Sequence, residues 1–141
     1  MNKLYFVFLL AVVFSSCSPY QKALKSEDIA VKYAAAEEKY NKGKYEKAIR
    51  LFEQIAPSYR GKPQAEKMFY MYAQSLYKTD QFYTAGYQFE SFASGYPKSE
   101  KVEEAAFLSA ESYSKLSPRY SVDQVDTSYL ETLIGYNARR A

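Results

Sequence analysis

The sequence predicts an all-α protein in which helical hairpins stack on one another, two complete and a third partial. Residues 44–60, KYEKAIRLFEQIAPSYR, place apolar side chains three and four positions apart, which is the spacing of one face of an α-helix. The same pattern returns 37 residues later, in residues 81–98, QFYTAGYQFESFASGYPK. The helix is therefore one copy of a repeated unit, and repeats of about this length form helical solenoids.

The composition excludes several classes of function. The chain of 141 residues has a net charge of +3, and its 19 basic and 16 acidic residues are interspersed, so no nucleic acid is expected as a partner. Histidine, the commonest general base and metal ligand, is absent. With no glycine-rich phosphate loop, metal-ligand spacing or nucleophile beside a base, we expect neither an enzyme nor a cofactor or metal site.

The start of the chain predicts a signal peptide, residues 1–16. Lys3 precedes an apolar run, residues 4–14, which at about 1.5 Å per residue is too short to span a hydrocarbon core of roughly 30 Å. A basic start, a short apolar run and the small residues Ser15 and Ser16 are typical of a secretory signal.

Cys17, the only cysteine, follows these small residues. The stretch FSSC, residues 14–17, resembles the bacterial lipobox, although Phe14 stands where that pattern prefers an aliphatic residue. The resemblance implies cleavage before Cys17, which then carries diacylglycerol as a membrane anchor. An ordinary cleaved signal and an uncleaved anchor are the alternatives. Residues 17–27 are then expected to form a lipid-anchored tether, in which Ser18–Glu27 has little to pack against.

Residues 28–141 form the predicted repeat domain. Its units are expected at about residues 28–60, 64–97 and 99–136, with first helices near residues 28–42, 64–79 and 100–116. Gly43 suits a tight turn inside the first unit, and Asp80, at the matching place of the second, is expected to cap the helix after it. Ser99 is expected to cap the first helix of the third unit.

The third unit departs from the repeat. A polar loop follows residue 116, and a possible second helix at about residues 126–136 lacks the pattern of the other second helices. No obvious polar capping helix follows it, although a solenoid normally needs one, so we expect these residues to belong to a longer array.

Small residues mark the place where the two helices of a hairpin cross. Ala36 and Ala48 allow the helix axes to approach, and the rings of Tyr40 and Phe52 fill the space beside them. Together with Gly43 they belong to the pattern A–x₃–Y–x₂–G–x–Y–x₂–A–x₃–F, which resembles the tetratricopeptide repeat. The resemblance implies a tetratricopeptide-like helical hairpin solenoid of two full repeats plus a partial third. An irregular helical bundle is the alternative.

Three segments after the lipobox-like stretch resemble the BamD family: YNKGKYEKAIRLFEQI, YAQSLYKTDQFYTAGYQFESFASGYPKSEKVEEAAF and SAESYSKLSPRYSVDQ. Members of this family are outer-membrane lipoproteins of the β-barrel assembly machinery, and the segments are most similar to its Bacteroidetes branch. The resemblance extends to about Gln124. Because family members are longer arrays, it implies that this chain is the N-terminal portion of one.

The same resemblance implies a protein anchored by lipid at the periplasmic face of the outer membrane. The implied partners are other subunits of the β-barrel assembly complex, including its central barrel protein, and unfolded outer-membrane protein peptides. The residues alone also allow another periplasmic repeat lipoprotein, one that coordinates cell-wall synthesis or acts as a secretion pilotin. A sugar-binding uptake lipoprotein is less favoured, because such proteins usually expose tryptophan and this chain has none.

In tetratricopeptide arrays the first helix of each hairpin lines a concave face, where peptides bind. The candidate peptide-binding and partner-binding residues on it are Tyr33, Glu37, Tyr70, Gln74, Phe107 and Glu111. Tyr40 and Tyr77 are expected to pack between helices, and a core role is the alternative for the other tyrosines as well. The carboxylate pairs Glu37–Glu38 and Glu103–Glu104 indicate a solvated surface, since adjacent residues on a helix do not face each other.

Overall fold

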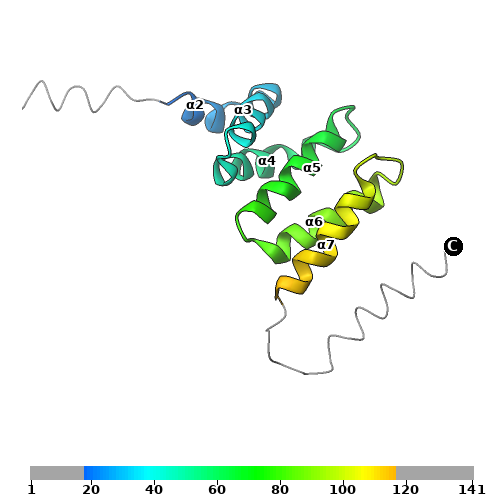
Figure 1. Ribbon diagram of the computed structural model, residues 1–141. Coiled ribbons are helices and arrows are strands. Elements are labelled where there is room, and N and C mark those ends of the chain that lie inside the picture. The colour runs from blue at the N-terminus through cyan, green and yellow to red at the C-terminus, as the bar shows by residue number, and fades with distance from the viewer. Residues whose placement is uncertain (1–17, 117–141) are drawn as a thin grey trace, which may run out of the picture.

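The regular structure of the described residues is entirely helical. The computed structural model describes residues 18–116, and residues 1–17 and 117–141 lie outside the described part (Figure 1). Its helices are α2 (Pro19–Lys25), α3 (Ile29–Asn41), α4 (Tyr45–Tyr59), α5 (Ala65–Lys78), α6 (Phe82–Gly95) and α7 (Val102–Leu116). The three predicted first helices are α3, α5 and α7, which agree with their expected bounds to within two residues.

The helices pack in the order of a hairpin solenoid. α3 packs against α4 and α5 against α6, which gives two hairpins. The hairpins are joined because α4 also packs against α5, and α6 against α7 (Figure 1). This arrangement confirms the predicted fold class, a stack of tetratricopeptide-like helical hairpins. The predicted second helix of the third unit, residues 126–136, lies outside the described residues.

Buried alanines are found in both helices of each hairpin. Ala36 and Ala48 in the first hairpin have no exposed surface, and neither do Ala73 and Ala85 in the second. A methyl side chain lets the two backbones approach, and larger side chains then fill the volume beside the contact. The largest of these, Phe52 and Phe89, are fully buried at equivalent positions of α4 and α6.

An edge-to-face ring pair closes each hairpin beside its turn. The ring centroids of Tyr40 and Tyr45 lie 5.7 Å apart at an interplanar angle of 71°, and those of Tyr77 and Phe82 lie 5.7 Å apart at 70°. Such pairs contribute about 0.5–1.5 kcal/mol beyond the burial of their area. The prediction that Tyr40 and Tyr77 pack between helices is therefore confirmed.

The turns of the two hairpins share one backbone geometry. Gly43 has a φ of +67°, and Asp80, 37 residues later, has a φ of +58°. In the first turn the Lys44 N–H donates to the Lys39 carbonyl oxygen (2.8 Å), and in the second the Gln81 N–H donates to the Leu76 carbonyl oxygen (3.0 Å). A left-handed residue after a helix with this bond is a Schellman-type C-cap.

Asp80 therefore ends the helix before it. The prediction that its side chain caps the next helix is wrong, because α6 begins after Gln81 and no side chain caps it. Ser99 lies in the turn before α7, where its hydroxyl oxygen accepts a hydrogen bond from the Lys101 N–H (3.1 Å) and its hydroxyl donates to the Glu66 carboxylate (2.6 Å).

The segment before the first hairpin is packed, which corrects the expectation that Ser18–Glu27 has little to pack against. Ser18 caps α2 through a hydrogen bond from the Tyr20 N–H (3.3 Å), and Pro19 occupies the first turn, where its missing N–H costs nothing. Tyr20 and Ala23 are buried against the first hairpin. The Tyr20 hydroxyl donates to the Lys47 carbonyl oxygen in α4 (3.2 Å). No helix within residues 18–116 is long and apolar enough to cross a membrane.

Placing a charge at a helix crossing tests the packing. We expect Ala85→Arg to destabilise the protein by roughly 3 kcal/mol or more, because the guanidinium enters a fully buried position without a partner. Thermal unfolding followed by circular dichroism measures the loss. Ser91→Arg, on the exposed side of the same helix, is the matched control, and equal stabilities of the two variants would contradict the crossing.

The turn geometry predicts opposite effects at two equivalent positions. Gly43→Ala is expected to cost about 1 kcal/mol, since no neighbouring atom lies within 4 Å of the added methyl group and the left-handed backbone is the only penalty. Asp80→Gly relieves the same penalty and is expected to leave stability unchanged or raised. Urea unfolding of both variants checks the prediction, which fails if Gly43→Ala is as stable as the unmodified chain.

Candidate functional site

The six predicted binding residues lie at equivalent positions of the first helices of three successive units, α3, α5 and α7. We call the surface that α3, α5 and α7 form around these residues the first-helix face. It consists of Tyr33, Glu37, Tyr70, Gln74, Phe107 and Glu111 with their direct polar neighbours. Each helix contributes one aromatic residue and, one turn later, one polar residue.

An ion pair connects the first two helices of this face. The Lys67 ammonium of α5 donates to the Glu37 carboxylate of α3, and this hydrogen bond raises the pKa of Lys67 above its usual value. Beside the pair, the Tyr33 ring stacks on Tyr59 of α4 with centroids 5.2 Å apart and planes 18° apart. Burial, and then the Glu37 charge, raise the pKa of Tyr33. Glu37 therefore joins two units as well as facing a tyrosine.

The second and third units meet through Tyr70. Its ring packs against Phe92 of α6, with centroids 5.5 Å apart, and its hydroxyl oxygen accepts a hydrogen bond from the Gln74 amide (2.9 Å). Burial, and then a hydrogen bond to the Glu104 carboxylate of α7, raise the pKa of Tyr70 far above its usual range. The same hydrogen bond, followed by that from Lys101 (2.9 Å), lowers the pKa of Glu104.

A second tyrosine makes a similar contact two turns further along α5. The Lys115 ammonium of α7 donates to the Tyr77 hydroxyl oxygen of α5 (2.6 Å) and lies 4.4 Å from the centre of that ring. Lys115 also pairs with Glu111 at 3.3 Å. Hydrogen bonding to Tyr77, and then to Lys115, lowers the pKa of Glu111. Two tyrosines of α5 thus each face a carboxylate–lysine pair: Glu104 with Lys101 at the start of α7, and Glu111 with Lys115 near its end.

The three aromatic residues of the face have different surroundings. Tyr33 and Tyr70 are half-buried against the second helix of their own hairpins, whereas the Phe107 side chain is 67% exposed. Among the described residues no ring contact joins these three to one another. The second helix expected in the hairpin of Phe107, residues 126–136, falls outside them.

Sequence reasoning missed the residues that bridge the units: Lys67, Lys101, Glu104 and Lys115. A signal for part of this set exists, because Lys67 and Glu104 are 37 residues apart and each lies three positions before a predicted aromatic residue. Extending the predicted stripe by one helical turn finds both.

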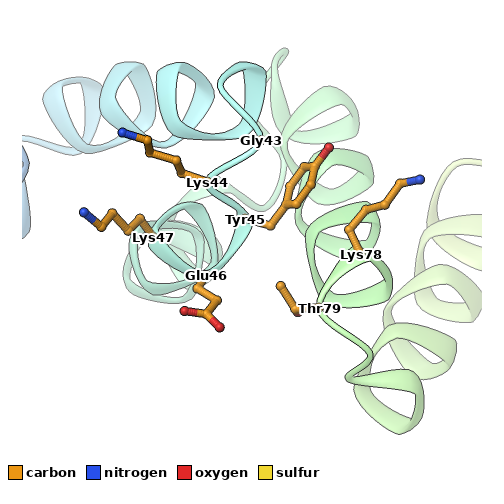
Figure 2. A pocket seen from close by; sticks show the side chains of 7 residues that line it. All are labelled: Gly43, Lys44, Tyr45, Glu46, Lys47, Lys78 and Thr79. Carbon is orange, nitrogen blue, oxygen red and sulfur yellow. The ribbon is translucent and has the colours of Figure 1, made fainter.

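One hollow in the described part of the chain lies apart from the first-helix face. It lies at the turn between α3 and α4 and is lined by Gly43, Lys44, Tyr45, Glu46, Lys47, Lys78 and Thr79 (Figure 2). The side chains of Lys44 and Lys47 extend to one side and that of Lys78 to the other, all away from Tyr45, so the three ammonium groups do not converge on a small anion (Figure 2). Within residues 18–116 there is also no group of three His, Cys, Asp or Glu side chains that could hold a metal ion.

The comparison with protein families decides the class of the chain. Residues 25–135 match the family YfiO, described as an outer membrane lipoprotein. The chain belongs to this family. The match begins in α2, covers both hairpins and α7, and extends beyond them, so it includes the whole first-helix face. No curated protein matches the chain.

Family membership supports the predicted BamD-like identity and an association with the outer membrane. The family description is that of a lipoprotein and names no enzymatic activity, in line with a scaffold. The closer similarity to the Bacteroidetes branch and the assignment as an N-terminal portion stay predictions.

Removing one tyrosine hydroxyl at a time tests the bridges between α5 and α7. We expect Tyr70→Phe to raise the pKa of Glu104 toward its ordinary value of 4.5, and Tyr77→Phe to do the same for Glu111 only. Titration of the glutamate carboxyl groups by NMR measures both values. Each variant is the control for the other, because both replace tyrosine by phenylalanine, which removes one hydroxyl group and keeps the packing of the ring.

The same shifts give a direction for acid sensitivity. Both carboxyl pKa values are lowered in the folded chain, so the stabilisation is present above the pKa of the unfolded chain and is lost as the pH falls toward the folded value. If neither carboxyl pKa responds to its tyrosine, the bridges do not form in solution.

Proposed function

We propose that the protein is a lipid-anchored scaffold of the β-barrel assembly machinery at the periplasmic face of the outer membrane. In this role it binds subunits of the assembly complex, the central barrel protein among them, and unfolded barrel proteins on its first-helix face. The observation that carries the proposal is the family match over residues 25–135, which covers the hairpins and that face together.

The anchor in this proposal is Cys17, which lies outside the described residues. Two features support it: the lipobox-like stretch at residues 14–17 and membership in a family of lipoproteins. Lipidation with two or three acyl chains gives stable attachment, because each buried methylene contributes about 0.8 kcal/mol.

The composition of the first-helix face suits a strand-like client. Strands of membrane barrels alternate apolar and polar side chains and carry aromatic residues near their ends. The partly exposed rings of Tyr33 and Tyr70, and Phe107 at the equivalent position of α7, offer surfaces for aromatic side chains. The lysine–glutamate pairs beside them offer both hydrogen-bond donors and acceptors to a polar edge.

The strength of these pairs also fits a transient client. Surface ion pairs contribute about 0.2–1 kcal/mol each, so a charged client group can open one at small cost. Their side chains are about half exposed or less on the glutamate side, which leaves them reachable from solvent. Binding of this kind is reversible, as a scaffold that passes clients onward requires.

Site-specific cross-linking tests the location of client binding. We expect a photo-cross-linking amino acid at the position of Phe107 to capture unfolded outer-membrane proteins. The same amino acid at Tyr83 of α6, whose side chain is 72% exposed and thus equally accessible, is expected to capture none. Cross-linking in cells and identification of the products by mass spectrometry provide the measurement.

A separate measurement tests membership in the assembly complex. The full chain, purified from detergent extracts, is expected to bring down the complex with its central barrel protein. Co-purification with cell-wall synthesis enzymes or a secretion apparatus in its place would replace the proposal by the alternative scaffold. Equal client capture from Phe107 and Tyr83 would refute the first-helix face as the binding site.

A further inference from the structure

We propose that the outward side of α2 rests on the phospholipid surface and thereby fixes the orientation of the hairpin stack on the membrane. This inference rests on the proposed lipidation of Cys17. The surface consists of Gln21, Lys22 and Lys25, all exposed, on the side of α2 opposite its packed residues.

The first argument is the length of free chain. α2 begins at Pro19 with Ser18 as its N-cap, so one residue separates Cys17 from a helix. An extended residue spans at most about 3.6 Å, whereas an unpacked segment of ten residues would span up to about 35 Å. The anchor therefore leaves the folded body almost no slack.

The second argument is that α2 is fixed to the body. Tyr20 and Ala23 are buried with 7% and 3% of their surface exposed, and the Tyr20 hydroxyl bonds to the backbone of α4. The Lys47 ammonium lies 5.4 Å from the centre of the Tyr20 ring. The link to α3 is also tied, since the Ser26 hydroxyl oxygen accepts from the Asp28 N–H (3.0 Å). A restraint on α2 is therefore passed to the first hairpin.

The third argument is charge. Lys22 and Lys25 make no ion pair within residues 18–116, and their flexible stems let the ammonium groups reach a phosphate layer. Of the two acidic residues that follow α2, Asp28 is engaged as the cap of α3, where its carboxylate accepts from the Ala30 N–H (2.8 Å). Glu27 is the remaining carboxylate beside the lysines.

The orientation has a consequence for the first-helix face. α2 lies at one end of the row of helices and α7 at the other (Figure 1). With α2 against the lipid, the stack extends away from the membrane, and Phe107 in α7 lies further from the surface than Tyr33 in α3.

The test measures how close two positions lie to lipid. The full lipidated chain is placed in vesicles of phosphatidylethanolamine and phosphatidylglycerol, with a fluorophore on Lys25→Cys or on Lys98→Cys in the loop before α7. An acylated Cys17 has no free thiol, so each introduced cysteine is labelled alone. Quenching by headgroup-labelled lipid is expected to be several-fold stronger at position 25 than at position 98.

A second variant distinguishes the effect of the short link between Cys17 and α2 from that of the lipid anchor itself. Inserting about twelve Gly-Ser residues after Ser18, with serine kept before Pro19, adds a flexible span of roughly 20 Å. Quenching at position 25 should then fall toward the value at position 98 while vesicle binding persists. Equal quenching at positions 25 and 98 in the vesicle-bound chain without the insertion would overturn the inference. Shielding of position 25 from both lipid-borne and water-soluble quenchers would also overturn it, because it would indicate that a second copy of the chain covers α2. A chain that carries no acyl mass and does not bind vesicles refutes the lipid anchor, and with it this inference.

Discussion

The close contact of two helices at buried alanines is the constraint on which the rest of the structure depends. Ala36 against α4 and Ala73 against α6 set the distance between the axes of each hairpin, and no larger side chain fits there without separating them. That distance places the rings of Tyr40 and Tyr77 against the start of the next helix in the same geometry twice. Because every unit repeats after 37 residues, equivalent positions recur in α3, α5 and α7.

The units are joined by polar as well as apolar contacts. The first-helix face joins them by ion pairs and tyrosine hydrogen bonds, beside an apolar core that runs through both hairpins. The apolar side of the joint is also close, as at Gly86 of α6, whose missing side chain makes room for the Tyr113 ring of α7. The Ser109 hydroxyl donates to the Gly86 carbonyl oxygen there (2.9 Å). The polar and the apolar contacts together fix the position of each unit relative to the next.

Local patterns predicted what local forces decide. The helix bounds, the crossing alanines and the turn at Gly43 follow from periodicity and backbone preference, and each is found as expected. The prediction for Asp80 was wrong because its side chain does not bond to the start of α6. Asp80 instead adopts the left-handed backbone conformation that Gly43 adopts, and so ends α5. The packing of α2 gave no periodic signal, since a helix of seven residues buries only Tyr20 and Ala23. The bridges of Lys67 and Glu104 depend on how units stack, which spacing along one helix does not determine.

The chemistry of the first-helix face makes its charge insensitive to pH near neutrality. The chain has no histidine, and the shifts that the bridges cause lower the carboxyl pKa values of Glu104 and Glu111 and raise those of Lys67 and Lys115. Each group is thereby moved further from titration in the neutral range, so these side chains keep their charge there. If the face binds charged clients as proposed, exchange occurs by competition, in which a charged group of the client replaces a glutamate or a lysine in a pair whose members stay ionised. Exposed pairs of this kind weaken as salt is added, so occupancy of the face should follow ionic strength and client charge.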